Sequence, residues 1–502
     1  AGIGVGVCSS VIPYVCDQLA MARLPRATFA LLLSLLPASS TAIGWLVLRQ
    51  VPTIADLMGT LLVAVGVAIH QERNLDRVRK LMTAAAESSQ GYETLAYLSD
   101  NIGPRLSGSK GAAMAVQWTT ERFRSWGIDV RQEKVMVPHW VRGAESALLV
   151  SHNDQRLALT TLGGSVATPP EGIVTDVIEA TSFDELSALG RQVAGKIVFL
   201  NRAMDMTLLS AGRALDSYRR AQELRARGAD RASQYGAVAV VIRSVGSASL
   251  RTPHTGSVVY EGAAVKIPAA ALAAEDAMLI HRLLVKGDRV SMHLLLRPRI
   301  FDDVESANVV AEIRGGECPD EIVLLGAHLD SWDVGTGAID NGAGVTMVME
   351  SVRLIHELDL APKRTIRAVL FMNEENGGRG ARQYFTDHEN ERHIAAIETD
   401  SGAAAPLGFV TTLNGVALSD FRRGVRIAKF EYAEDTGVDT RPFIKAGVTG
   451  FGLVPDQRHY FDYHHSAADT LDKIDPHELA QNTAALAALT YVIAETGVPS
   501  PR

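Results

Sequence analysis

The second half of the chain alternates short apolar runs with polar segments rich in carboxylates and histidines. Residues 322–325, 366–372 and 394–397 are mainly apolar runs with the length expected of buried parallel strands. Acidic or imidazole side chains follow each run within a few residues. Because open α/β sheets bind their ligands at the carboxyl ends of their strands, this pattern predicts a functional site along one edge of a parallel sheet.

The segment after the first run, GAHLDSWDVGTGAIDNGAG at 326–344, contains several candidate ligands. His328 and Asp330 are two residues apart, so their side chains point the same way on an extended backbone. Asp340 begins a turn, and a helix with one apolar face is expected after it. These residues indicate a metal site, although a polar loop between a strand and a helix would give the same pattern.

More candidate ligands follow the other two runs and stand near the C-terminus. Glu374 and Glu375 end the second run, Asp400 follows the third, and HYFDYHHSAADT contains His464 and His465. Together with the histidine and the aspartates of the first segment, they provide imidazole nitrogens and carboxylate oxygens. Such a set suits two Zn²⁺ ions that share a bridging carboxylate and leave a position for water.

Five motifs occur in the order and approximate spacing of a known family: HLD, DNGAG, NEE, ETD and HHSAAD. The sequence thus resembles the dinuclear zinc exopeptidases of the bacterial aminopeptidase and glutamate carboxypeptidase type. Within them it most resembles the plasma glutamate carboxypeptidase branch, also called carboxypeptidase Q. The strings GPRLSGS and PHWVRG extend the resemblance, so that it runs from about residue 76 to 490.

The resemblance implies a ligand set by matching motif positions one by one. His328 and Asp400 would hold one zinc ion, and Glu375 and His465 would hold the other. Asp340 would bridge the two ions, because a bridging anion reduces the repulsion between two dications at about 3.5–4 Å.

The resemblance also implies roles for residues that bind no metal. Glu374 would be the general base, and Asp330 would orient His328 from behind. His464 would line the substrate pocket, since the family's ligand directly precedes Ser or Thr. A cis peptide bond is expected between Asp340 and Asn341.

The implied activity is that of a zinc-dependent exopeptidase acting on short peptides through metal-activated water. Aminopeptidase, dipeptidase and carboxypeptidase specificities share these ligands, so the sequence leaves them open. A zinc deacylase acting on non-peptide amides would use the same chemistry. A transporter-like membrane protein with a non-catalytic soluble part is another alternative, whereas a serine hydrolase is disfavoured because no GxSxG elbow stands at a strand–helix junction.

The N-terminal 72 residues have a different composition. Residues 1–16 and 57–69 carry no charge, and 27–48 form an uncharged run of 22 residues, long enough to span a bilayer. We therefore expect about three transmembrane helices, which resemble the C-terminal part of an EamA-type drug/metabolite transporter and would contact the lipid bilayer. A buried helical hairpin is the alternative. The loop charges favour a cytoplasmic peptidase, whereas the family's relatives are mostly exported.

The remaining chain suggests a divided peptidase domain. Residues 73–147 would form its first part and 301–502 its main part with the metal site. Residues 148–300, with short strands and few candidate ligands, resemble the protease-associated domain inserted in many family members. This insert would shape substrate access, although a chemically silent spacer fits as well.

The composition argues against a nucleic-acid-binding protein and against a disulfide-rich protein, and it does not change the expected fold class. A net charge of −8 gives no basic footprint for nucleic acid, and three cysteines make no disulfide framework. A homodimer is compatible with the sequence. The expected fold class is α/β: a zinc-exopeptidase sheet with helices on both faces, an inserted β-rich domain, and the N-terminal transmembrane block.

Overall fold

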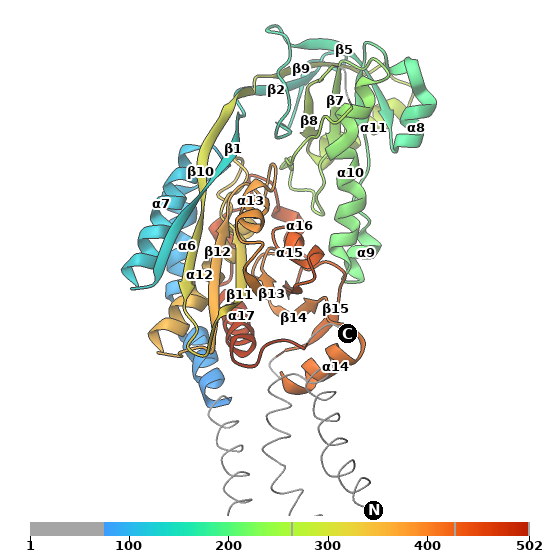
Figure 1. The fold of residues 1–502 in the computed structure, drawn as a ribbon. Helices are drawn as coiled ribbons and strands as arrows, with labels where there is room; N and C mark the ends of the chain where they lie inside the picture. Colours follow the sequence, from blue (N-terminus) through green and yellow to red (C-terminus); the bar gives the residue numbers. More distant parts are fainter. Residues whose placement is uncertain (1–74, 263–264, 426–427, 500–502) are drawn as a thin grey trace, which may run out of the picture.

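The computed structural model describes residues 75–499 apart from 263–264 and 426–427 (Figure 1). Two mixed sheets of eight strands each organise this part of the chain. The first sheet has the strand order β1 (Asp129–Val141), β10 (Arg299–Ile313), β12 (Arg364–Phe371), β11 (Cys318–His328), β13 (Arg392–Glu398), β16 (Thr449–Pro455), β14 (Pro406–Thr411) and β15 (Phe430–Tyr432).

The centre of the first sheet is parallel. Strands β12, β11, β13 and β16 run in one direction, so their carboxyl ends lie along the same edge. Strand β10 is antiparallel to both β1 and β12. The three apolar runs in the sequence fall on β11, β12 and β13, and the predicted strands are thus present.

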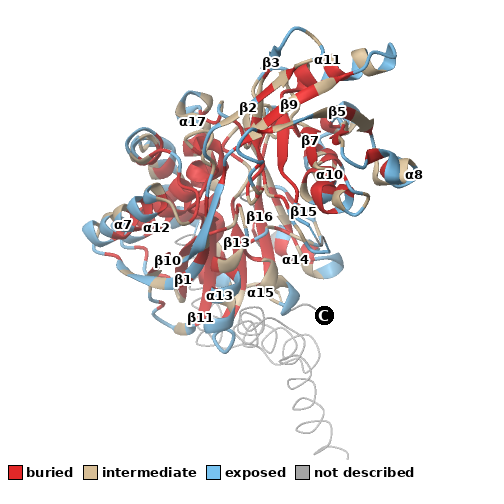
Figure 2. Cartoon of the chain, turned by 90° about the horizontal axis from the view of Figure 1, so that it is seen from above, coloured by how far each residue is buried: buried red, intermediate tan, exposed pale blue. Residues whose placement is uncertain are grey.

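Helices cover both faces of the first sheet. Side chains alternate along β11, so Val323 and Leu325 enter one apolar core while Leu324 enters the other. The larger core is covered by α6 (Gln90–Ala96), α7 (Lys110–Ser125), α12 (Ala343–Glu357) and α17 (Pro476–Thr496). The smaller core is covered by α13 (Arg379–Asp387) and α15 (Arg441–Lys445). Buried residues form a continuous band along the central strands (Figure 2).

Local signals set the ends of two of these helices. The sequence Asp475-Pro476 with Glu478 three residues after the aspartate predicts a helix start. Asp475 is the N-cap of α17 and accepts hydrogen bonds from the backbone N–H groups of His477 and Glu478. In the first turn of α13, the chain comes so close to the end of β12 that a Cβ atom at Gly380 would lie 2.2 Å from the carbonyl oxygen of Met372. Only glycine permits this approach.

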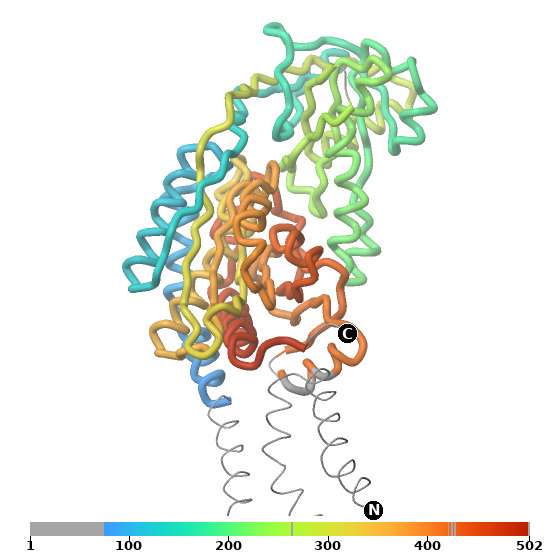
Figure 3. The backbone as a smooth tube through the Cα atoms, in the orientation of Figure 1, coloured from blue at the N-terminus to red at the C-terminus, as the bar shows by residue number. Residues whose placement is uncertain are grey.

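The second sheet has the order β3 (Gln155–Leu157), β2 (Glu145–Leu149), β9 (Ser291–Leu296), β5 (Ile173–Ala180), β6 (Ile197–Leu200), β7 (Ala239–Arg243), β8 (Ala269–Leu272) and β4 (Leu159–Thr161). It is packed with α8 (Phe183–Leu189), α9 (Met206–Ser210), α10 (Ala214–Ser233) and α11 (Ala274–Val285). This region is therefore mixed α/β rather than simply β-rich. The long strands β1 and β10 extend from the first sheet toward it (Figure 3).

The expected fold class needs one correction. A membrane-spanning helix needs about 20 mostly apolar residues, and over the described residues no helix is long and apolar enough to cross a membrane. The predicted block of about three transmembrane helices at 1–72, with its EamA-like assignment and its bilayer contact, lies outside the described residues and has no support here. The fold is a mixed α/β fold of two sheets and their helices. The homodimer prediction is not tested by this single chain.

Candidate metal centre

The parallel strands bring the predicted ligands to one edge of the first sheet. His328 is the last residue of β11, Glu375 follows β12 and Asp400 follows β13. Asp340 comes from the segment between β11 and α12, and His465 directly follows the short helix α16 (Tyr460–Tyr463) and His464. Residues separated by more than a hundred positions thus meet because the strand ends are adjacent in the sheet.

These five side chains form two groups that share Asp340. The Nε2 atom of His328 lies 3.2 Å from Oδ1 of Asp340 and 3.1 Å from Oδ1 of Asp400. The Nε2 atom of His465 lies 3.2 Å from Oδ2 of Asp340 and 3.0 Å from Oε2 of Glu375. Asp340 therefore presents one oxygen to each histidine, which is the arrangement that a bridging carboxylate requires.

The donor set fits zinc ions. Imidazole nitrogens and carboxylate oxygens are zinc ligands, and the donor atoms of His328, Asp340 and Asp400 all lie within 4.8 Å of one another. The ring N–H at Nδ1 of His328 is donated to the carbonyl oxygen of Asp330 at 2.9 Å. Nε2, which faces the carboxylates, is therefore the nitrogen available to a metal.

A third histidine lies about as close to Asp340 as His328 and His465 do. The Nε2 atom of His464 is 3.3 Å from Oδ2 of Asp340, and its ring stacks on that of His465 at 3.6 Å. Asp340, His464 and His465 thus form a further set of three residues, which overlaps the group of His465 and whose donor atoms are close enough to hold an ion. Burial and the neighbouring His465 hold the pKa of His464 well below its usual range, so the ring is neutral. Only His465 also lies beside Glu375, which distinguishes the two histidines.

Asp330 makes contacts that the sequence did not suggest. Its carboxylate accepts hydrogen bonds from the backbone N–H groups of Asn373, Glu374 and Glu375, at 2.8, 3.1 and 3.4 Å. The expectation was that this carboxylate would orient His328, but the carboxylate lies 3.9 Å from Nδ1 of the ring, and the backbone carbonyl makes the closer contact. The Asp330 side chain instead fixes the turn that carries Glu374 and Glu375.

Asp469, the one acidic residue of HHSAAD, fixes the backbone at Asp340. Its two oxygens accept the backbone N–H groups of Ile339 at 2.6 Å and Asp340 at 3.1 Å. The peptide bond between Asp340 and Asn341 is cis, as the family resemblance implied. The Asn341 amide donates to the carbonyl oxygen of Thr399 at 2.9 Å and so connects this segment to the end of β13.

A fully buried guanidinium lies beneath the centre. Arg105, from the GPRLSGS string, donates to the carbonyl oxygens of Leu329, Thr336 and Gly337 at 3.0, 2.7 and 2.8 Å. Burial lowers the pKa of Arg105 to about 10, although nearby carboxylates, Asp469 first among them, act in the opposite direction. The side chain stays protonated near neutral pH and offsets part of the negative charge of the centre. Nothing in the GPRLSGS string itself indicates this role.

The second sheet contributes one loop to the centre. His254 donates its Nδ1 hydrogen to the carbonyl oxygen of His464 at 2.6 Å, and the Thr255 N–H donates to that of His465 at 2.8 Å. The Ser257 hydroxyl donates to the carbonyl oxygen of Glu375 at 2.9 Å. This loop therefore supports two of the predicted ligands, and nothing in the sequence indicated such contacts.

Two further carboxylates, which the sequence pattern does not indicate as site residues, lie close to the centre. Glu398 accepts the backbone N–H groups of Val438 and Thr440 at 2.8 and 2.7 Å. Asp439 is buried, and neither of its oxygens has a hydrogen-bond partner among the described residues. Burial and Glu398 raise the pKa of Asp439 well above its usual range. A lone histidine such as His139 is more often packed than a metal ligand, and His139 stacks on Phe301 in the β1–β10 ribbon.

Comparison with known proteins agrees with this geometry. Residues 308–490 match the model of Peptidase family M28. Carboxypeptidase Q of Bos taurus is 38% identical over 423 residues, which cover 82% of this chain and 87% of that protein. Aminopeptidase YwaD of Bacillus subtilis is 24% identical over 473 residues, covering 88% of this chain and 93% of that protein.

Solved structures agree as well. The peptidase M28 precursor from Shewanella amazonensis SB2B superimposes with a TM-score of 0.81 at 36% identity, covering 86% of this chain and 99% of that chain. A zinc aminopeptidase from Bacillus subtilis has a TM-score of 0.61 at 19% identity, covering 82% and 98%, and shares the fold. The chain therefore belongs to peptidase family M28 and is a metallo-exopeptidase that uses two Zn²⁺ ions and acts on peptides.

Proposed function

We propose that this enzyme hydrolyses terminal peptide bonds of short peptides at the site built around Asp340. In this proposal His328 and Asp400 hold one zinc ion, Glu375 and His465 hold the second, and Asp340 bridges them. The observation that best supports it is the position of Asp340, whose two carboxylate oxygens each lie 3.2 Å from the Nε2 atom of a different histidine.

Glu374 is the general base in this proposal. When bound, the two zinc ions supply Lewis-acid activation of water and stabilise negative charge on the substrate carbonyl oxygen. Glu374 takes a proton from the attacking water and returns it to the leaving amine. Burial raises the pKa of Glu374 well above its usual range, and Asp400 and Glu375 act in the same direction while His328 opposes them.

The neighbouring side chains orient these groups. Asp330 holds the backbone of the turn at 373–375 and, through its carbonyl, the ring of His328. His464 lines the substrate pocket beside Asp340, where a neutral ring can accept or donate one hydrogen bond.

The domain division supports the same function. We propose that 73–147 and 301–502 form the peptidase domain and that 148–300 form a protease-associated insert. The separate second sheet supports the division, and the contacts of Thr255 and Ser257 with the metal-centre loops support a role of the insert in shaping substrate access.

A substrate screen tests the exopeptidase against the deacylase alternative. The zinc-loaded enzyme is assayed on free dipeptides, N-blocked dipeptides, aminoacyl amides and N-acyl amino acids, with Glu374→Gln as the matched inactive control. We expect turnover of peptides with at least one free end. If the enzyme hydrolysed only substrates whose acyl group is not an amino acid, this result would contradict the proposal and favour the deacylase.

A further inference from the structure

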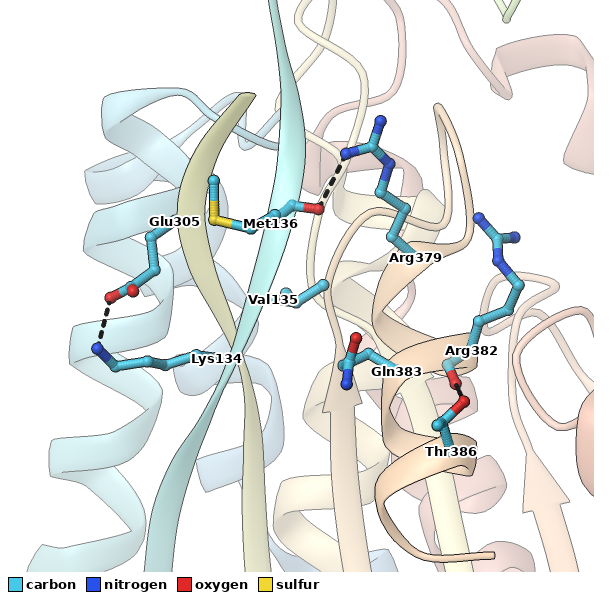
Figure 4. Close-up of a pocket in the computed structure, with 8 residues that line it drawn as sticks. All are labelled: Lys134, Val135, Met136, Glu305, Arg379, Arg382, Gln383 and Thr386. Atoms are coloured by element: carbon cyan, nitrogen blue, oxygen red, sulfur yellow. Dashed lines mark hydrogen bonds and ion pairs between the residues drawn. The ribbon is translucent and has the colours of Figure 1, made fainter. Parts of the chain in front are cut away.

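Arg142 lies at the junction of the two sheets. It directly follows β1 of the first sheet, and β2 of the second sheet begins three residues later. Strand β1 is attached to α13 before this point, because Arg379 donates to the carbonyl oxygen of Met136 at 3.1 Å. Lys134 also pairs with Glu305 across the β1–β10 ribbon at 3.1 Å (Figure 4). The side chain of Arg142 therefore starts from a strand whose position is fixed.

The guanidinium of Arg142 contacts both sheets at once. Its Nε and Nη2 atoms lie 2.9 and 2.5 Å from the two carboxylate oxygens of Asp333, which makes a bidentate pair. Nη1 donates to the Thr160 hydroxyl at 2.8 Å and to the carbonyl oxygen of Thr161. Nη2 also donates to the Thr255 hydroxyl at 3.3 Å. Only 12% of the Arg142 side chain is exposed, so these contacts are largely shielded from water.

The contact with Asp333 leads to the proposed ligand Glu375. Asp333 lies in the segment between β11 and α12, which also carries Asp340. The residue before Asp333 is Trp332, whose backbone N–H donates to Oε1 of Glu375 at 3.2 Å. The other oxygen, Oε2, lies 3.0 Å from Nε2 of His465. A hydrogen bond to one oxygen of a ligating carboxylate fixes the orientation in which the other oxygen meets a metal.

The contact with Thr255 leads to the proposed ligand His465. The Thr255 backbone N–H donates to the carbonyl oxygen of His465 at 2.8 Å. The Thr255 hydroxyl accepts from Arg142 and donates to the carbonyl oxygen of Thr161 at 3.0 Å, so it is held from two sides. The indole of Trp332 also packs edge-to-face on the His465 ring, with centroids 5.7 Å apart. Both branches from the guanidinium thus end at ligands assigned to the second zinc ion.

The ligands assigned to the first zinc ion are supported differently. His328 donates its Nδ1 hydrogen to the carbonyl oxygen of Asp330, and Asp400 follows β13 in the centre of the first sheet. Among the described residues, neither His328 nor Asp400 is hydrogen-bonded to Asp333 or Thr255. The network around Arg142 therefore reaches one of the two proposed zinc positions and not the other.

We propose that Arg142 is a positioning residue for the second zinc ion. One branch, through Asp333, orients Glu375, and the other, through Thr255, orients His465. The inference rests on the proposed function, because Glu375 and His465 must be the ligands of that ion. It adds to that function a role for the junction of the two sheets, which determines how firmly one of the two ions is held.

Arg142→Lys tests this role in the intact enzyme. Lysine keeps the positive charge but cannot form the planar bidentate pair with Asp333. Elemental analysis after dialysis against a series of zinc-buffered solutions gives the affinity for each ion. His465→Gln marks the loss of the second ion. Arg131→Lys is the matched control, because Arg131 pairs with Glu133 on the same strand through Nε and Nη2, both at 2.8 Å.

We expect Arg142→Lys to bind the first ion as the wild type does and the second ion about 10–100-fold more weakly. At a free zinc concentration that just fills both sites of the wild type, it should therefore lose the second ion, as His465→Gln does. Excess zinc should restore kcat/KM for a dipeptide in Arg142→Lys, because no group that contacts the substrate is changed. Arg131→Lys should keep both ions throughout.

A double-mutant cycle with Asp333→Asn tests the branch to Glu375. Asp333→Asn should weaken the second ion in the wild type but have little further effect in Arg142→Lys, where the bidentate pair is already lost. Effects of the two substitutions that add in full would contradict this branch.

Two results would overturn the inference: unchanged affinity for both ions in Arg142→Lys, or an equal loss of both. Equal loss with a lower melting temperature is what a purely structural junction would give. Failure of the proposed function looks different. If the two-zinc wild type hydrolysed no peptide, the zinc affinities would still test Arg142, and if His465→Gln kept both ions, the ligand assignment and this inference would both be rejected.

Discussion

Side chains that contact no metal in the proposed scheme determine where the ligands lie. Asp330 accepts three successive backbone N–H groups of the turn at 373–375, and Asp469 accepts the N–H groups of Ile339 and Asp340. A buried carboxylate that accepts several N–H groups fixes the backbone more firmly than a single bond can. The positions of the proposed ligands thus depend on carboxylates that hold the ligands' backbone as much as on the packing of the ligand side chains.

Replacement of the base tests the roles of the adjacent glutamates. Glu374→Gln keeps the size of the side chain but removes the proton acceptor, so we expect both zinc ions to remain and kcat to fall by about 10²–10⁴-fold. Zinc content by elemental analysis and turnover of a dipeptide check this. If zinc were lost in proportion to activity, Glu374 would be the ligand and Glu375 the base.

Replacement of Asp330 tests the capping role. In Asp330→Asn one oxygen becomes an NH₂ group, which must face backbone N–H groups that it cannot accept. We expect zinc affinity to fall about 10–100-fold, as for other residues that orient ligands. The exposed Asp320→Asn is the matched control and should leave zinc affinity unchanged, whereas equal affinities in both variants would show that the Asp330 carboxylate does not position the turn.

At the scale of elements, the sequence predicted those parts of the structure that depend on local pattern. The apolar runs of β11, β12 and β13 and the cap of α17 were readable because each depends on neighbouring residues. The contacts of Glu398 and Arg105 were not readable, because each joins segments distant in sequence. In addition, the sequence around a single acidic or basic residue looks the same whether that residue is exposed at the surface or buried in the core.

Helix α13, which carries Arg379 and Arg382, is attached to β1 by one titratable contact. His388, at the C-terminal end of this helix, lies 2.9 Å from the carboxylate of Glu133. This hydrogen bond, only partly opposed by burial, raises the pKa of His388 above its usual value of 6.5. The contact therefore stabilises the fold fully below about pH 6.5 and is lost as pH rises through the higher folded-state pKa.

Thermal melting at several pH values tests this contact. Between pH 6.5 and 8 we expect the melting temperature of the wild type to fall more steeply than that of His388→Gln, whose side chain does not titrate. His152→Gln, in the insert, provides the control and should follow the wild type. Parallel curves for the wild type and His388→Gln would mean that this pair contributes nothing to stability in that range.

At the scale of the whole molecule, the second sheet is coupled to the metal centre through α10 and the loop that carries His254. A run of arginines such as that between residues 219 and 231 is typical of a solvated helix face, but Arg225 is buried. Its guanidinium donates to the Tyr218 hydroxyl at 2.8 Å and to the carbonyl oxygen of Thr255 at 3.3 Å. Tyr218 in turn stacks on Phe461, next to the two histidines.

Loss of this coupling should reduce activity without removing any proposed ligand. Arg225→Met keeps most of the side-chain volume but leaves the Thr255 carbonyl and the Tyr218 hydroxyl without their donor, at a cost of about 1–3 kcal/mol. We expect a lower melting temperature and weaker binding of the zinc ion assigned to His465, because the Thr255 N–H supports the carbonyl of that residue. Arg227→Met, on the exposed face of the same helix, should resemble the wild type. If the two variants had the same zinc affinity and kcat/KM, the insert would be a spacer, and its contacts with the centre would not contribute to catalysis.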